Sequence, residues 1–298
     1  MEQLCRALAR SGVQAEREYP LSQHSSFRIG GCAALAIFPK TRDEMIRSLQ
    51  LLTEYGVPYV TVGKASNVVF DDKGFAGAVL FTTAFRDISV ENGLIRASAG
   101  ASLYSVAVTA AQHGLSGLEF AHGIPGTLGG GVLMNAGAYG GSLSDVCVQS
   151  EYFDAQSGAI KELSGQAQNF SYRSSIYLSN PSYTILGATL AGKPDDPESI
   201  RARMDDYKNR RRASQPLEYP SAGSVFKRPE GHFAGKLIED CGLKGLRVGG
   251  AEVSQKHAGF IVNRGGATCE DVKRLVARIQ AAVLEKTGVM LEPEIRFI

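Results

Sequence analysis

A cluster of glycines is the strongest constraint that this sequence places on its fold. At the usual glycine frequency of roughly 7%, this chain of 298 residues would hold about 21, but it has 34. Glycine allows a positive φ and lets other atoms approach the main chain closely. The cluster predicts a tightly turned structural loop or a main chain shaped around a ligand, and loops of this length are more often functional. Ten of the glycines lie in residues 114–141: Gly114, Gly117, Gly123, Gly126, Gly129, Gly130, Gly131, Gly137, Gly140 and Gly141.

Hydrophobic periodicity predicts that helices and strands alternate on both sides of this cluster, which is an α+β pattern. Helices are expected at 41–56, where Thr41 and Glu44 resemble a capping box, and at 103–113, 200–212 and 268–288. Strands are expected at 59–62, 76–82, 94–97, 148–154 and 183–190, with a hairpin turn at 156–158. The Gly- and Pro-containing stretch 192–197 predicts a boundary between compact units.

Composition narrows the class of protein. With 44% hydrophobic residues the chain can bury a sizeable core, and its net charge of +2 gives no reason to expect a nucleic-acid partner. No run of 18 apolar residues occurs, so no membrane span is expected. The five cysteines form no CxxC pair, and the N-terminus lacks an apolar signal core. We therefore expect a reduced, cytoplasmic protein.

The standard nucleotide and metal motifs do not fit. Gly63-Lys64 resembles part of a phosphate-binding loop, but Pro58 occupies the position of the upstream glycine and Ala65 that of the Ser or Thr. The run 129–131 starts like a Rossmann fingerprint, but Met134 stands where its later glycine would be. The five histidines have no metal-ligand spacing, so no metal is expected. The glycine cluster therefore needs another explanation.

Three segments combine small residues with polar side chains. Residues 62–67 follow a predicted strand and could offer amides to an anion, although an ordinary turn is the simpler interpretation. Residues 117–141 could wrap a flat ring or a diphosphate, and Pro125-Gly126 predicts a type II turn with Gly126 at a positive φ. In 220–227, the hydroxyl of Ser224 could donate a proton or bind an anion, or Ser224 could be a turn serine.

Taken together, these segments resemble one enzyme family. The chain is similar over nearly its whole length to the UDP-N-acetylenolpyruvoylglucosamine reductases, which are also called UDP-N-acetylmuramate dehydrogenases. The short connection between Arg173 and Ser224 resembles the family's type II form. The resemblance rests on the order of HSSFRIGG at 24–31, VGKASN at 62–67, the segment 123–141, YRSS at 172–175, AGSVFK at 222–227, AEVS at 251–254, HAGFIVN at 257–263 and LEPE at 291–294.

The resemblance implies an α+β flavoenzyme of peptidoglycan synthesis. Its FAD-binding part would have two subdomains of the p-cresol methylhydroxylase/vanillyl-alcohol oxidase type, at 1–80 and 81–195. A C-terminal α+β substrate-binding domain would follow at 196–298. This fold is not a Rossmann fold, which agrees with the missing fingerprint. FAD would be bound non-covalently, the partners would be NADPH and a UDP-sugar, and the protein would be a monomer.

The family motifs also imply ligand-binding residues by position. FAD would be bound by Gly63, Lys64, Ala65, Ser66, Asn67, Gly123, Ile124, Pro125, Gly126, Thr127, Gly129, Gly130, Asn135 and Gly137. The substrate would be bound by Lys227, Arg212, Gln215 and His257. Two positions depart from the family pattern. Ala65 replaces a glycine, which would cost roughly 1 kcal/mol if that position needs a positive φ, and Arg228 stands where type I members have a substrate-binding asparagine.

The implied reaction reduces an enolpyruvyl group. NADPH would deliver a hydride to FAD and leave, and flavin N5 would pass a hydride to C3 of the vinyl group. Negative charge would then develop at C2 and on the adjacent carboxylate. The family motifs imply that Arg173 and Glu294 stabilise this charge and that Ser224 protonates C2. Because the three residues lie on separate segments, we expect a site at a domain interface.

Two other hypotheses remain open at this point. One is another FAD-dependent oxidoreductase of the same fold superfamily, such as an oxidase with a covalently tethered flavin. The other is a non-catalytic protein that binds a nucleotide or nucleic acid through the basic run 208–212. The near-neutral net charge is an argument against a nucleic-acid partner.

Overall fold

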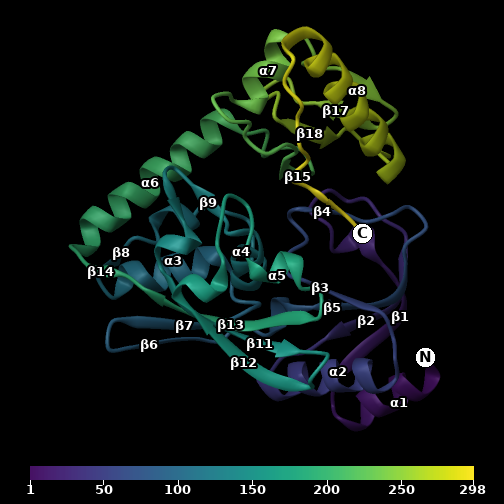
Figure 1. Cartoon of the computed structure of the whole chain (residues 1–298), viewed down its shortest axis with the longest axis vertical. Helices are drawn as coiled ribbons and strands as arrows, with labels where there is room; N and C mark the ends of the chain where they lie inside the picture. The colour runs from purple at the N-terminus through teal and green to yellow at the C-terminus, as the bar shows by residue number, and fades with distance from the viewer. The chain divides into compact units, whose positions relative to one another are not determined.

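The computed structural model describes all residues from Met1 to Ile298 and divides the chain into two compact units (Figure 1). Unit 1 comprises Met1–Arg17, Leu35–Lys64 and Gly77–Arg210, and unit 2 comprises Glu18–Ala34, Ala65–Ala76 and Arg211–Ile298. Each unit is thus assembled from three separate stretches of chain. The sequence predicted three consecutive segments, 1–80, 81–195 and 196–298, and that scheme stays a prediction.

The first sheet has the strand order β1-β2-β5-β3. Helices α1 (Glu2–Arg10) and α2 (Arg42–Glu54) bury Leu8 and Leu49 in one cluster with Leu80 of this sheet (Figure 1). Thr41 caps α2 as predicted, but the Glu44 carboxylate accepts the N–H of Lys40 rather than completing a capping box. The strands are β1 (Gln14–Pro20), β2 (Cys32–Phe38), β3 (Tyr59–Val62) and β5 (Phe75–Phe81).

A second sheet in unit 1 has five antiparallel strands in the order β12-β11-β13-β7-β6. Helices α3 (Leu103–Gln112) and α4 (Leu128–Met134) share a buried cluster with it, in which Val106 and Val132 meet Leu190. The predicted hairpin turn at 156–158 joins β11 to β12. The strands are β6 (Ile88–Glu91), β7 (Leu94–Ser98), β11 (Cys147–Asp154), β12 (Ala159–Ser164) and β13 (Tyr183–Ala191).

Unit 1 also contains short elements and most of the long helix α6 (Pro197–Ser214), and the division between the units falls within that helix, between Arg210 and Arg211. The boundary at 192–197 stays a prediction. None of the helices of the protein is both long and apolar enough to cross a membrane. The short elements are the 3₁₀ helices η2 (Thr82–Ala84), η3 (Glu119–Ala121), η4 (Leu143–Asp145) and η5 (Gly165–Gln168), helix α5 (Ile176–Ser179), and strands β8 (Leu115–Ser116), β9 (Gly137–Ala138), β10 (Gly141–Ser142) and β14 (Lys193–Pro194).

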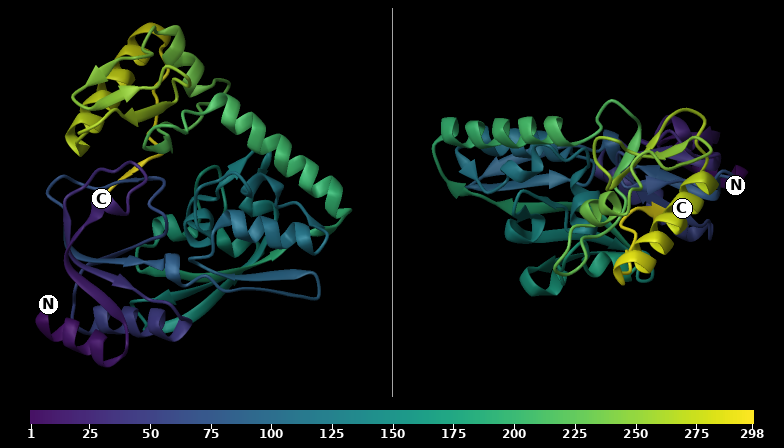
Figure 2. Two further views of the ribbon diagram at one scale, coloured as in Figure 1. Left: turned by 180° about the vertical axis from the view of Figure 1, so that it is seen from behind. Right: turned by 90° about the horizontal axis from the view of Figure 1, so that it is seen from above.

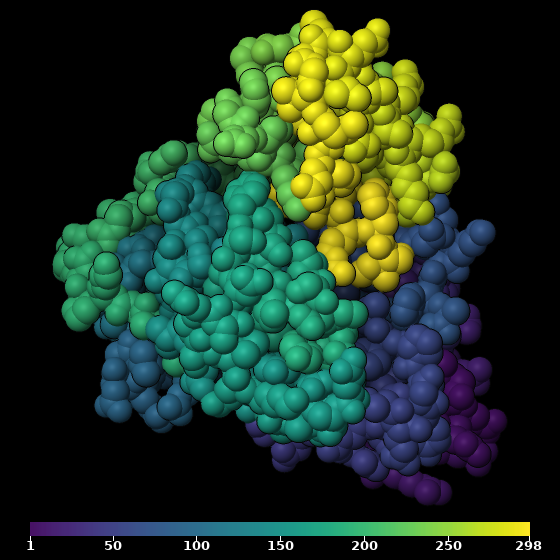
Figure 3. All heavy atoms as spheres, in the orientation of Figure 1, coloured from purple at the N-terminus to yellow at the C-terminus, as the bar shows by residue number.

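Unit 2 is built on a four-stranded sheet with the order β15-β18-β17-β16, against which α7 (Ala234–Asp240) and α8 (Cys269–Thr287) pack (Figure 2). Helix α8, whose residues fall at the yellow end of the colour scale in Figure 3, begins after Thr268, which forms a capping box with Asp271, and ends at Gly288, whose φ is 72°. The other elements are η1 (Leu21–Gln23), β4 (Val68–Val69), β15 (Ser221–Ser224), β16 (Arg247–Val248), β17 (Ala251–Val253), β18 (Phe260–Asn263) and β19 (Arg296–Phe297).

Candidate cofactor and substrate site

The glycine-rich segment 114–141 is not the irregular loop that the sequence predicted. It contains η3, helix α4 and the start of a small hairpin of β9 and β10. Of its ten glycines, only Gly114, Gly117 and Gly140 have a positive φ. The predicted type II turn at Pro125-Gly126 is wrong because Gly126 has no positive φ. Instead, the carbonyl of Gly126 accepts the N–H of Leu103 at 3.1 Å, where the chain pairs with the start of α3.

Several glycines of this segment are needed because other atoms fill the space that a Cβ would take. A Cβ on Gly129 would lie 2.9 Å from that of Ala99, and one on Gly141 would lie 2.8 Å from the ring of Phe120. A Cβ on Gly137 would lie 2.7 Å from the carbonyl oxygen of Gly141. Gly130 differs, because its nearest neighbour would be Thr127 Oγ1 at an ordinary 3.7 Å. Close packing, rather than φ, therefore explains much of the cluster.

Two of the predicted FAD-binding segments meet within unit 1. Gly63 follows β3, and Thr127 precedes α4. A Cβ on Gly63 would collide with Oγ1, Cγ2 and Cβ of Thr127. Only glycine therefore fits at position 63 while Thr127, which is 2% exposed, keeps its place. The structure brings these two segments together; that they bind FAD stays a prediction.

The last three residues of the first predicted FAD-binding loop, Ala65, Ser66 and Asn67, belong to unit 2. Ala65, which replaces the family's glycine, has a φ of 47°, so this position does require left-handed backbone and the expected strain is present. The Asn67 side-chain amide donates to the carbonyl of Glu294 at 3.1 Å, and the main-chain carbonyl of Asn67 accepts the N–H of Arg296 at 3.0 Å. This loop is thereby fastened to the segment that carries a predicted catalytic residue.

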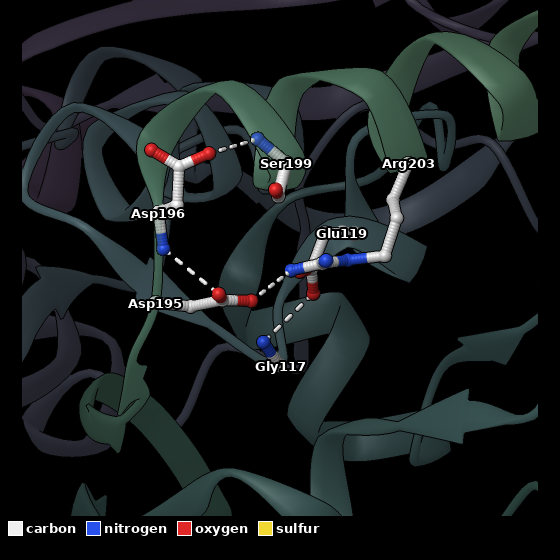
Figure 4. Close-up of polar contacts among 6 residues, drawn as sticks. All are labelled: Gly117, Glu119, Asp195, Asp196, Ser199 and Arg203. Atoms are coloured by element: carbon white, nitrogen blue, oxygen red, sulfur yellow. Dashed lines mark hydrogen bonds and ion pairs between the residues drawn. The ribbon is translucent and has the colours of Figure 1, made fainter.

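An ion-pair network fastens the start of the glycine-rich segment to α6 (Figure 4). The Arg203 guanidinium donates to the buried Glu119 carboxylate at 2.8 Å and 3.0 Å and pairs with Asp195 at 2.5 Å. Glu119 also accepts the N–H of Gly117 at 2.7 Å. These carboxylates raise the pKa of Arg203, and the largest cause is the hydrogen bond that Arg203 donates to Glu119. The network therefore fixes the main chain at Gly117 and Glu119, just before the predicted FAD-binding residues that start at Gly123.

Arg173 lies at the tip of a tight turn in unit 1. Its φ of 54° places it in the left-handed region, and its guanidinium donates to the carbonyls of Gly137 at 2.9 Å and Asn135 at 3.5 Å. The guanidinium also lies over the ring of Tyr172, 5.0 Å from its centroid. A cation held in this way suits a carboxylate, which an arginine can bind with two parallel hydrogen bonds.

Ser224 and Glu294, the other two predicted catalytic residues, lie on neighbouring segments of unit 2. The N–H of Glu294 donates to the carbonyl of Val225 at 2.8 Å, which places residue 294 beside the end of β15. Gly223, with a φ of 78°, turns the strand immediately before Ser224. The Ser224 hydroxyl makes a long bond of 3.4 Å to the carbonyl of Phe226. So long a hydrogen bond holds the hydroxyl weakly.

The four predicted substrate-binding residues also lie in unit 2 but have different surroundings. Lys227 pairs with Glu292, and Arg212 is exposed while its carbonyl accepts the Lys256 ammonium. The buried Gln215 Oε1 has no partner within the protein. Nδ1 of His257 accepts the N–H of Gly259 at 3.1 Å, and burial lowers the pKa of this histidine. His257 therefore has a local structural role, and its contact with substrate stays a prediction.

The surroundings of His122 fit a bound FAD. His122 directly precedes the predicted FAD-binding residues 123–130, and its buried Nδ1 has no hydrogen-bond partner within the protein. Burial and the nearby Lys208 lower its pKa, which favours the neutral ring, and Tyr104 packs against it with centroids 4.8 Å apart. An orphaned buried nitrogen of this kind calls for a polar partner. No sequence motif assigns His122 to the site, although its position directly before Gly123 is a signal for such a role.

The chain is similar over nearly its whole length to enzymes of one family. The chain is 46% identical to the UDP-N-acetylenolpyruvoylglucosamine reductase of Caldicellulosiruptor bescii, over 98% of this chain and 93% of the relative. It is 45% identical to the enzyme of that name from Lactobacillus acidophilus, over 98% and 97%. The crystal structure of the Thermus caldophilus enzyme matches 96% of this chain and 98% of its own, with a TM-score of 0.80 and 34% identity.

Two stretches of the chain also match known domain families. Residues 33–164 match the family model of an FAD-binding domain, so the protein is an FAD-dependent oxidoreductase with the predicted α+β fold. Residues 215–298 match the C-terminal domain of UDP-N-acetylenolpyruvoylglucosamine reductase. The chain belongs to the UDP-N-acetylenolpyruvoylglucosamine reductase family of peptidoglycan synthesis, as the resemblance implied. A non-catalytic binding protein is thereby ruled out.

Proposed function

We propose that this enzyme reduces the enolpyruvyl group of UDP-N-acetylenolpyruvoylglucosamine to give UDP-N-acetylmuramate, with NADPH as the reductant. The names of relatives at 45–46% identity support the substrate. FAD, held by the residues predicted to bind it, would supply the hydride transfer from NADPH to C3 of the vinyl group. The C2–C3 double bond becomes a single bond, and its electron pair moves to C2 and the adjacent carboxylate. The cytoplasmic location and the monomeric state stay predictions.

Arg173 stabilises the charge that develops on the substrate carboxylate. Its guanidinium is already oriented by the carbonyls of Gly137 and Asn135. A cation that is oriented before the reaction need not reorganise when the charge appears, and this is the main source of electrostatic catalysis. Glu294 shares this work as a hydrogen-bond donor, either in its protonated form or through a bridging water.

Ser224 donates the proton that completes the reaction at C2. The observation that carries this proposal is the bond from the Glu294 N–H to the carbonyl of Val225, because it holds Glu294 beside the residue that directly follows Ser224. The weak 3.4 Å bond of the Ser224 hydroxyl leaves its proton available. The C2 carbanion is a far stronger base than an alkoxide, so a hydroxyl suffices as the acid. The serine then regains a proton from solvent.

Lys227, Arg212, Gln215 and His257 bind the UDP-sugar in this proposal. Lys227 and Arg212 supply positive charge for a diphosphate, and the partnerless Oε1 of Gln215 can accept one hydrogen bond from the ligand. Of these, Lys227 is also the residue three positions beyond Ser224, so a diphosphate held there would lie on the same segment as the proton donor.

The test separates the two halves of the reaction with the flavin absorbance. Purified Ser224→Ala enzyme should lose its yellow absorbance with NADPH at the wild-type rate. It should fail to regain that absorbance when the enolpyruvyl substrate is added under anaerobic conditions. Ser221→Ala, on the same strand β15, is the matched control and should complete both steps.

Two outcomes would contradict the proposal. Equal loss of both half-reactions in Ser224→Ala would remove Ser224 from the proton-transfer step. A wild-type enzyme that is reduced by NADPH but not reoxidised by the enolpyruvyl substrate would contradict the substrate itself.

A further inference from the structure

Asn135 lies at a junction of three segments of unit 1. It ends helix α4 in the left-handed conformation, with φ 42° and ψ 58°, and is 6% exposed. Its Oδ1 accepts the N–H of Ser144 at 2.9 Å, and its Nδ2 donates to the carbonyl of Ser171 at 3.0 Å. Both ends of the side-chain amide therefore bind protein groups, whereas the family resemblance implied that Asn135 binds FAD.

The segment held by this amide is the turn that carries Arg173. Ser171 and Ser174 exchange both main-chain hydrogen bonds, at 3.0 Å and 3.2 Å, so that Tyr172 and Arg173 form the corner. The Ser175 hydroxyl adds a second tie by donating to the carbonyl of Leu133, in the last turn of α4, at 2.8 Å. The turn is thus fixed to the C-terminal end of one short helix.

The same helix end also holds the guanidinium itself. The last carbonyls of helix α4 have no partner within the helix. The C-terminal end of a helix therefore carries partial negative charge, which favours a cation. Arg173 donates to the carbonyl of Asn135, which caps the helix, and to that of Gly137, two residues further on in β9. Asn135 therefore contacts Arg173 through its main chain and holds the base of the Arg173 turn through its side chain.

We propose that Asn135 is a positioning residue, whose amide fixes the turn at 171–174 so that the Arg173 guanidinium meets the substrate carboxylate in its productive orientation. This inference rests on the proposed role of Arg173 in the reaction. A side chain that acts on a developing charge must be placed to within a fraction of an ångström, and a shift of about 1 Å can lower a rate about 100-fold. Loss of the amide tie should therefore affect turnover rather than cofactor or substrate binding.

The test variant is Asn135→Gly, because glycine keeps the left-handed backbone and removes only the amide. We expect the FAD content and the rate of flavin reduction by NADPH to match the wild type. The kcat for the enolpyruvyl substrate should fall about 10- to 100-fold with little change in KM. Asn169→Gly is the matched control, because Asn169 is exposed, also has a positive φ of 46° and lies two residues before the turn. That control should keep the wild-type kcat.

A double-mutant cycle shows whether Asn135 acts through Arg173. In an Arg173→Lys background, Asn135→Gly should lower kcat little further. An equal loss in both backgrounds would overturn the proposal, as would loss of FAD with an unchanged kcat per bound flavin. Asn135→Asp, which keeps the size and tolerates the left-handed backbone but replaces the donor to Ser171, should show the same selective loss of kcat. If the wild-type enzyme does not turn over the enolpyruvyl substrate, the proposed function fails instead.

Discussion

Gly131 packs so closely on Leu143 that an added Cβ would lie 2.8 Å from the leucine Cδ1, within a fully buried part of unit 1. Gly130, its neighbour in α4, leaves ordinary space for a Cβ. We expect Gly131→Ala to lower the free energy of unfolding by about 1–3 kcal/mol through overpacking. Gly130→Ala should be neutral or raise it by up to about 1 kcal/mol, because alanine is the better helix former. Urea denaturation of both variants checks this, and equal effects would contradict the packing explanation.

The left-handed backbone of Ala65 predicts a stabilising substitution. Ala65→Gly should raise the free energy of unfolding by up to about 1 kcal/mol, because glycine relieves the strain of the left-handed backbone. Part of this gain is offset because glycine increases the conformational entropy of the unfolded chain. Ala258 is equally buried at 4% and has no positive φ. Ala258→Gly should therefore lower the free energy of unfolding by about 0.4–1 kcal/mol. Destabilisation by both changes would show that position 65 is not strained.

The contact between Arg203 and Glu119 predicts that removing a positive charge from α6 destabilises the protein at position 203 but not at position 201. Arg203→Met leaves the Glu119 carboxylate, which is 7% exposed, without its cation (Figure 4). Because Arg203 is partly exposed and solvent screens the pair, we expect a loss of about 1–3 kcal/mol in the free energy of unfolding. Arg201→Met, at an exposed position of the same helix, should change it by less than about 0.5 kcal/mol. Thermal or urea unfolding of the two variants makes the comparison.

Asp154 predicts a dependence of stability on acidic pH. Hydrogen bonds from Lys161, from the Ser157 hydroxyl and from the main chain lower the pKa of this carboxyl to about 2. A carboxyl whose pKa is lower in the folded state stabilises the protein above its unfolded pKa, near 3.8, and loses that effect as the pH falls toward 2. Asp154→Asn should therefore be less stable than the wild type at pH 7, and the difference in urea midpoint should shrink between pH 5 and pH 2. A constant difference over that range would contradict this assignment.

Local patterns in the sequence were enough to locate part of the main elements, including α2, α3, α6 and α8, and the enzyme family. The cap at Thr41, the capping box of Thr268 with Asp271, and the end of α8 at Gly288 all depend on residues within a few positions of one another. Such signals can be read from the chain alone because hydrogen bonds at a helix end are local. The ordered motifs likewise identified the family and its FAD-binding domain before any contact was known.

The tertiary structure alone decided why the glycines are there and what Asn135 does. Most glycines of the segment 114–141 do not need a positive φ, and several of them make room for atoms of other residues, as Gly129 does for Ala99. Outside the segment, Gly63 makes room for Thr127 in the same way. Asn135 likewise uses its amide on Ser144 and Ser171, which no local pattern indicates. Propensity and capping are set by neighbours along the chain, whereas the space beside a residue and the partners of its side chain are set by whichever segments fold against it.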